Sequence, residues 1–101
     1  MADATLLYQV KKIYPDGAIK EMAIWRLPEL TIERPHSLKY RLYYGMADGT
    51  CMVRYDNEAG KADHRHFLDE EKGYLFKNVE SLVNDFQNDI DLIRRKNHEQ
   101  K

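Results

Sequence analysis

The side chains best suited to chemistry are concentrated in one segment, residues 54–66, which reads RYDNEAGKADHRH. Residues two apart on a strand share a face of a sheet. If a hairpin turn separates the two ends of the segment, four side chains converge on one surface: Arg54, Asp56, His64 and His66. Lys61 would lie at the rim of that surface, free to swing in.

This set suits the cleavage of RNA without a metal ion. The reaction needs a base for the 2′-hydroxyl proton, an acid for the leaving 5′ oxygen and a cation for the charge that develops on the phosphate. Histidine serves as acid and base near neutral pH, so His64 and His66 are the candidate pair. The other catalytic candidates are two phosphate-holding cations, Arg54 and Lys61, and two acids that would orient a histidine, Asp56 and Asp63.

Two other interpretations of the segment stay open. With neutral histidines its three cations and three acids cancel, and interleaved charges on a hairpin often form only cross-strand ion pairs. The segment would then be a contact surface. Alternatively, His64 and His66 with a nearby aspartate could bind a divalent ion, although Arg54 and Arg65 would repel it. We expect no metal and no cofactor.

A substrate surface can be predicted from the same alternation. Tyr43 shares its strand face with Lys39 and Arg41, whereas Tyr40 and Tyr44 share theirs with leucines and are expected in the core. Tyrosine and arginine can stack on the bases of single-stranded RNA. The candidate substrate-binding residues are Arg41, Tyr43, Tyr55 and Arg65, although Arg65 would point away from the histidines on a regular strand. We expect His36 and His98 to be solvated.

The rest of the chain predicts the elements that position these residues. Alternating apolar residues around Pro15-Asp16-Gly17 indicate a β-hairpin over residues 5–27. A three-stranded meander over 38–67 carries the candidate site. Apolar residues at spacings of three and four predict a helix over 78–95, capped by Asn78, and the tail over 97–101 is expected to fray. The predicted fold class is α+β, with an antiparallel sheet of about five strands and one long helix on a face.

Several features of the helix and the connections carry separate expectations. The side of the helix with Asp85, Asp89 and Asp91 is predicted to be a solvated acidic face. The connection from Pro28 to Pro35 could leave a strand edge that accepts a partner strand. The sequence leaves a homodimer open.

Length and composition limit the class of protein. The 101 residues predict one domain over 1–101, and the formal net charge of −1 excludes a globally basic nucleic-acid binder. The lone Cys51 fits a reducing compartment and is expected to be a buried, unreactive thiol. The chain shows no signal peptide and no apolar run long enough for a membrane span. We therefore expect a cytoplasmic protein that does not associate with membranes.

Three stretches resemble the TumE-like toxins of bacterial type II toxin–antitoxin pairs: SLKYRLYYG, VRYDNEAGKADHRHF and YLFKNVESLVNDFQNDI. The likeness covers residues 36–93, and its centre is YDNE-x-GK-x-DHRH, with Ala62 where the family usually has glycine. The resemblance implies a toxin whose cognate antitoxin carries a DNA-binding domain. The matching positions are Arg54, Tyr55, Asp56, Asn57, Gly60, Lys61, Asp63, His64, Arg65 and His66. Gly60 would serve the turn, and Asn57 would cap it through an Asx-type bond.

Residues and resemblance together predict a toxin that acts on RNA as a metal-independent endoribonuclease. One alternative is a non-enzymatic module that binds nucleic acid or the antitoxin. Another is a metal-dependent nuclease or nucleotidyl-transfer enzyme.

Overall fold

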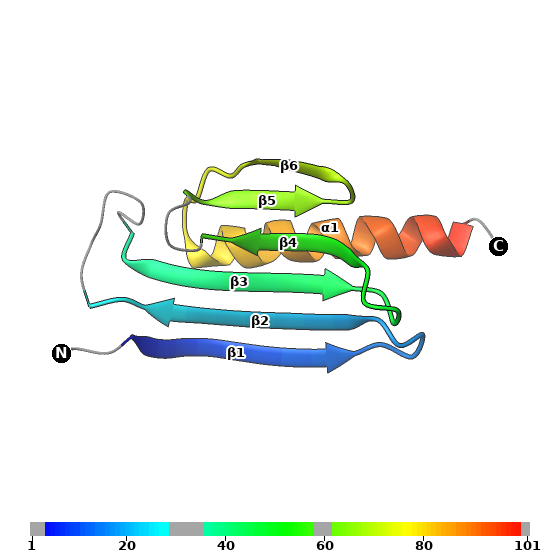
Figure 1. Cartoon of the computed structure of the whole chain (residues 1–101), viewed down its shortest axis with the longest axis horizontal. Helices are drawn as coiled ribbons and strands as arrows, with labels where there is room; N and C mark the ends of the chain where they lie inside the picture. The colour runs from blue at the N-terminus through cyan, green and yellow to red at the C-terminus, as the bar shows by residue number, and fades with distance from the viewer. Residues whose placement is uncertain (1–3, 29–35, 58–61, 100–101) are drawn as a thin grey trace.

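In the described part of the chain, six antiparallel strands form one sheet in sequence order, and one helix packs on a face of it (Figure 1). The computed structural model describes residues 4–28, 36–57 and 62–99. The strands are β1 (Thr5–Ile13), β2 (Ile19–Arg26), β3 (Leu38–Gly45), β4 (Cys51–Asp56), β5 (His64–Phe67) and β6 (Glu70–Gly73). The predicted α+β class is confirmed, with one strand more than expected.

The first hairpin, β1–β2, forms as its turn sequence predicts. Gly17 has a φ of 88°, in the left-handed region that glycine adopts at no steric cost. The Tyr14 amide donates to the Ala18 carbonyl at 2.8 Å, and the Ala18 amide donates to Asp16 Oδ1 at 3.1 Å. The aspartate and glycine of the Pro-Asp-Gly turn therefore fix the register of the two strands.

The extra strand is β6, which pairs with β5 through a two-residue connection, Leu68-Asp69. Leu68 has a φ of 57°, a conformation that leucine rarely adopts. All four residues of β6 are exposed, and three of them are charged. Since the strand has no apolar alternation and its turn has no glycine, neither usual sequence signal of a hairpin is present.

The helix α1 runs over Val79–Glu99, so it continues beyond the predicted end at residue 95 and through part of the tail expected to fray. Its predicted N-cap is confirmed, because the Ser81 amide donates to Asn78 Oδ1 at 2.7 Å. No glycine or proline follows residue 95. No helix-breaking residue therefore interrupts α1 between residue 95 and Glu99.

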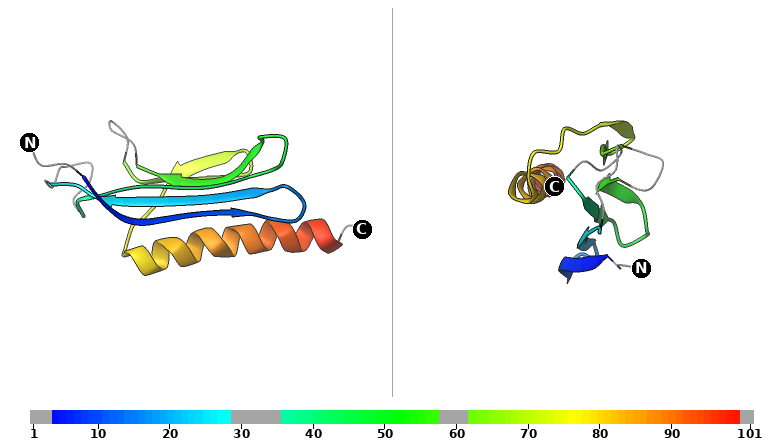
Figure 2. Two further views of the ribbon diagram at one scale, coloured as in Figure 1. Left: turned by 90° about the horizontal axis from the view of Figure 1, so that it is seen from below. Right: turned by 90° about the vertical axis from the view of Figure 1, so that its left-hand side faces the viewer.

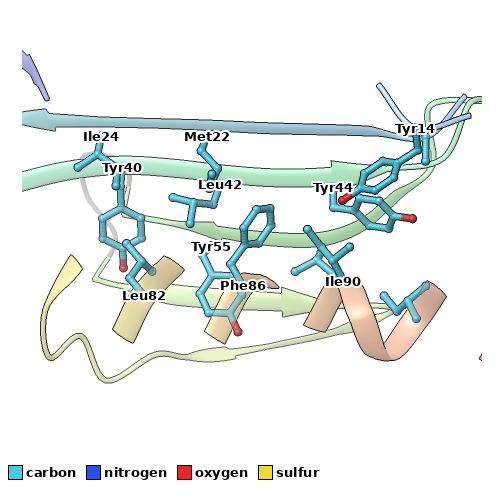
Figure 3. Packing of buried hydrophobic residues seen from close by; sticks show 13 residues of the cluster. Tyr14, Met22, Ile24, Tyr40, Leu42, Tyr44, Tyr55, Leu82, Phe86 and Ile90 are labelled. Carbon is cyan, nitrogen blue, oxygen red and sulfur yellow. The ribbon is translucent and has the colours of Figure 1, made fainter. Parts of the chain in front are cut away.

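The core lies between α1 and the sheet (Figure 2). Figure 3 shows Tyr40, Leu42 and Tyr55 of the sheet directed toward Leu82, Phe86 and Ile90 of α1. Each of these six side chains is at most 1% exposed. The burial of Tyr40 and Tyr44 confirms that these two tyrosines belong to the core.

The opposite face of the sheet is not covered by any element of the described residues (Figure 2). Because side chains alternate along a strand, this open face receives the residues between the core positions. It carries Arg41 and Tyr43 of β3, Arg54 and Asp56 of β4, and His64 and His66 of β5. Within the described part of the chain, no helix is long and apolar enough to cross a membrane.

Candidate active site

Asp56 joins the two halves of the charged segment on the open face. The register of β4 and β5 sets Asp56 opposite His64, and Arg54 opposite His66. Asp56 Oδ2 lies 2.9 Å from Arg54 Nε, and Asp56 Oδ1 lies 2.6 Å from His64 Nε2. One carboxylate therefore contacts a guanidinium and an imidazole at the same time.

The His64 ring has acceptors on both of its nitrogens. Nδ1 lies 3.1 Å from the Ala62 carbonyl oxygen, and Nε2 lies 3.2 Å from Glu71 Oε1 in addition to its contact with Asp56. Carbonyl and carboxylate oxygens only accept hydrogen bonds, so a ring nitrogen that carries a proton can donate it to one of them. The His64 ring is therefore held from both sides.

Asp56, Arg54 and His64 form what we call the Asp56 cluster. Their mutual contacts are close but poorly aligned as hydrogen bonds. Five buried polar atoms of the described residues have no aligned hydrogen-bond partner: Tyr40 Oη, Arg54 Nε, Asp56 Oδ1, Asp63 Oδ1 and His64 Nε2. Three of the five belong to the Asp56 contacts, which are therefore ion pairs by distance. Buried polar groups are usually satisfied, so their concentration here distinguishes this part of the sheet from an ordinary polar surface.

The three side chains of the Asp56 cluster differ in how much of their surface is exposed to solvent. The side chains of Asp56 and His64 are 5% and 11% exposed, whereas that of Arg54 is 29% exposed. Arg54 meets Asp56 through Nε, which leaves its two terminal nitrogens without a partner among the described residues. A hollow of about 410 Å³ beside His64 is lined by Asp63, Glu71 and Lys72, among others. The hollow therefore gives access to His64, and the partial exposure of Arg54 leaves its guanidinium accessible.

Asp63 does not join the histidines of the segment. Its Oδ2 lies 2.9 Å from Nε2 of His36, whose Nδ1 accepts a hydrogen bond from the Leu38 amide at 3.0 Å. His36 also packs on Phe76, with ring centroids 4.1 Å apart. The expectation of a solvated His36 is wrong, and so is that of Asp63 orienting His64 or His66. No local pattern indicates this pair, because 27 positions separate its members.

Burial, with the neighbouring Asp63 carboxylate, raises the pKa of the Tyr40 hydroxyl far above its ordinary value. The hydroxyl interacts electrostatically with Asp63 but forms no aligned hydrogen bond. Tyr40 faces the helix, so this interaction lies across the sheet from the Asp56 cluster. It belongs to the core and not to the open face.

Arg65 and Tyr55 also lie on the helix side. Arg65 donates from Nε and Nη2 to the two oxygens of Asp89, both at 2.8 Å, and the Tyr55 hydroxyl donates to Asp89 Oδ2 at 2.6 Å. Burial and this hydrogen bond raise the pKa of Tyr55. Both residues tie β4 and β5 to α1, and their substrate-binding role stays a prediction.

The acidic side of α1 is correspondingly not a simple solvated face. Asp89 is engaged by Arg65 and Tyr55, and Asp85 accepts a hydrogen bond from the Tyr74 hydroxyl at 2.6 Å. Asp91 accepts only an exposed bond from Gln87. The prediction was therefore wrong for two of the three aspartates, because the spacing on the helix did not reveal their partners on other elements.

Arg41 and Tyr43 stay candidates for substrate binding by their position. The register places Arg41 beside Asp56 and Tyr43 beside Arg54. The Arg41 guanidinium lies 5.4 Å from the centroid of the Tyr43 ring. A Cβ atom at Gly45 would overlap the Tyr43 hydroxyl, so glycine at that position allows the ring to lie along the strand.

Asn57, at the end of β4, fastens that end to β3. Its Oδ1 accepts a hydrogen bond from the Tyr40 amide at 3.0 Å, and its Nδ2 donates to the Leu38 carbonyl at 2.8 Å. The side chain is fully buried. Gly60 and Lys61 lie outside the described residues, so their roles, and that of Asn57 in the turn, stay predictions.

The other potentially reactive groups of the described residues are the metal-ligating side chains and Cys51, and they form no second catalytic or metal site. Among the described residues, no group of three or more His, Cys, Asp or Glu side chains is arranged to hold a metal ion. Cys51 is half-buried, and burial raises the pKa of its thiol. A raised pKa disfavours the reactive thiolate.

The sequence matches a protein-family model, described as Toxin TumE, over residues 2–94. The chain belongs to the TumE toxin family. The family resemblance noted in the charged segment is thus confirmed, and the match extends it to the first hairpin. The protein is a toxin of a toxin–antitoxin system, which implies a cognate antitoxin as partner. Searches of curated proteins and of solved structures gave no match.

Proposed function

We propose that this TumE-family toxin cleaves RNA as a metal-independent endoribonuclease in the cytoplasm. The observation that carries the proposal is the double contact of Asp56, which holds Arg54 and His64 together on the open face. His66 lies opposite Arg54 in the register and completes the set. An acid–base pair, a positioning carboxylate and a cation with free nitrogens are what metal-free transesterification of RNA requires.

In this proposal His66 is the general base and His64 the general acid. His66 takes the proton of the 2′-hydroxyl while the 2′ oxygen bonds to phosphorus. His64 donates its Nε2 proton to the 5′ oxygen as the bond from phosphorus to that oxygen breaks, and the contact between Nε2 and Asp56 Oδ1 opens for this transfer because Nε2 carries only one proton. The products are a 2′,3′-cyclic phosphate and a 5′-hydroxyl end. The leaving oxygen would approach from the side that Glu71 occupies, since the side chain of Glu71 is half-exposed and can move away.

Arg54 would bind the non-bridging phosphate oxygens through its two terminal nitrogens. A guanidinium aimed at charge that develops in the transition state is worth a few kcal/mol. Lys61 is proposed as a second cation at the rim, and Arg41 and Tyr43 as contacts to the neighbouring nucleotides. We further propose that the antitoxin carries a DNA-binding domain, with a homodimer as an additional arrangement to test.

Cleavage and binding should be measured together on purified protein, with RNA in EDTA at neutral pH. His64→Ala, His66→Ala and Arg54→Ala should each lower cleavage by about 100-fold or more, whereas the histidine variants should still bind RNA. Arg95→Ala removes an exposed cation from α1 and should change neither quantity. If each histidine variant only weakens RNA binding by a modest factor and the wild type does not cleave RNA, the segment is a contact surface and the proposal fails.

A further inference from the structure

A groove lies on the open face next to the proposed active site, over β1, β2 and β3. Its volume is about 310 Å³, at the lower end of the range for small-ligand sites. Its lining includes Lys11 of β1, three residues of β2 (Glu21, Ala23 and Trp25) and Arg41 of β3. The β1 and β2 residues of the groove take no part in the proposed cleavage step.

The groove combines an aromatic surface with space beside it. Trp25 is the only tryptophan of the chain and is half-buried. Ala23, two residues away on the same face, is small and leaves the middle of the groove open. The Lys39 ammonium lies 5.7 Å from the centroid of the Trp25 ring. An indole face with a nearby cation is the arrangement on which nucleobases of single-stranded RNA stack.

The charges around the groove suit a nucleotide. Lys11 and Arg41 line it, and Lys39 lies over the Trp25 ring, with Glu21 as the one acid among the groove residues named above. The cations can neutralise the phosphates on either side of a base. The Glu21 carboxylate can accept a hydrogen bond from an exocyclic amino group of the base.

The register joins the groove to the proposed active site. Ala23 pairs with Arg41, and Arg41 pairs with Asp56. Since neighbouring strands are about 4.8 Å apart, the floor of the groove lies about 10 Å from Asp56. Arg41 stands between the two, so a strand that presents a phosphate to Arg54 passes Arg41 before it reaches Trp25.

We infer that this groove binds a nucleobase of single-stranded RNA next to the cleaved phosphate, with Trp25 as the stacking platform. The inference rests on the proposed function for the identity of the strand. It adds a binding subsite for the substrate, which the acid–base residues by themselves do not define.

The fluorescence of Trp25 provides a direct test, because no other tryptophan contributes. A short single-stranded RNA of mixed sequence, 2′-O-methylated so that it cannot be cleaved, should quench the emission to saturation. A duplex of the same strand should not, since its bases are already stacked. Binding of the single strand, detected by anisotropy of a labelled RNA, without a change in Trp25 emission would overturn the inference, as would no binding at all.

Variants separate stacking from general loss of structure. Trp25→Leu should weaken binding of the labelled RNA by about 5- to 100-fold, and Trp25→Phe, which keeps an aromatic face, should recover most of it. The matched control is Tyr8→Leu, because Tyr8 is an exposed aromatic residue that pairs with Ile24 on the helix side of the sheet. Equal affinities for Trp25→Leu and Tyr8→Leu would overturn the groove assignment.

Failure of this inference is distinguishable from failure of the proposed function. If the wild type cleaves RNA and Trp25→Leu cleaves it with the same KM, the groove assignment is overturned and the ribonuclease stands. If RNA saturably quenches Trp25 but the wild type cleaves nothing, the groove is supported as an RNA-binding site and the ribonuclease proposal fails.

Discussion

Replacing Asp56 with asparagine tests whether this carboxylate holds the proposed active site together. The change keeps the shape of the side chain but removes its charge. It also replaces one acceptor oxygen with an NH₂ group, which must face either Arg54 Nε or His64 Nε2, now 2.9 and 2.6 Å from the two carboxylate oxygens. Arg54 Nε is always a donor, so asparagine can accommodate Arg54 only by facing its own donor toward His64.

The size of the effect follows from burial. The Asp56 side chain is 5% exposed, and depriving a buried polar group of its partner costs about 1–3 kcal/mol, or more when the group is charged. We expect Asp56→Asn to lower the free energy of unfolding by about 2–3 kcal/mol. For a domain of this size each kcal/mol shifts Tm by about 4–8 °C. A total stability of about 5–15 kcal/mol would leave the variant folded at room temperature.

Urea denaturation followed by circular dichroism measures the change, and Glu71→Gln provides the control. Glu71 contacts the same Nε2 of His64 at 3.2 Å, but its side chain is 50% exposed. An exposed ion pair contributes about 0–1 kcal/mol. If Asp56→Asn lowers the free energy of unfolding no more than Glu71→Gln does, the buried double contact of Asp56 does not organise the site.

Three further outcomes follow from the same structure. Asp89→Asn should lower the free energy of unfolding by about 1.5–3 kcal/mol, because it disrupts the paired contact with Arg65; an unchanged urea midpoint would contradict this. Cys51 should react with iodoacetamide at mildly alkaline pH more slowly in the folded protein than after unfolding, since burial raises its pKa; equal rates would exclude the burial. Four of the seven tyrosines have raised pKa values, so they should stay protonated above pH ~10 until the protein unfolds. Unfolded tyrosines lose their protons there, so stability should fall as pH rises through that value; a tyrosinate absorbance titration identical in folded and unfolded protein would contradict the assignment.

Local signals in the sequence predicted the elements that depend on local chemistry. The Pro-Asp-Gly turn, the alternation of β3 and the Asn78 cap all act through neighbours in the chain, and the structure confirms each of them. Strand β6 has no such signal, because it is short and charged and its turn places Leu68 at a positive φ.

The sequence predicted on which face of the sheet a residue lies better than it predicted which distant residue its side chain contacts. The alternation correctly separated His64 and His66 from Arg65, but it did not reveal that Asp89, 24 positions away, binds Arg65. Likewise, His36 pairs with Asp63 only because the start of β3 and the start of β5 meet at one end of the sheet. Such pairs depend on tertiary packing, for which one sequence carries no periodic pattern.

The chemistry of the cleaved ends tests the central proposal most directly. Purified toxin should be incubated with single-stranded RNA in EDTA, and the ends of the fragments identified, with His66→Ala as the inactive control. We expect fragments with 2′,3′-cyclic phosphate and 5′-hydroxyl ends that form without any divalent ion and disappear in the variant. Fragments with 5′-phosphate ends, or cleavage that occurs only with an added divalent ion, would contradict the proposal.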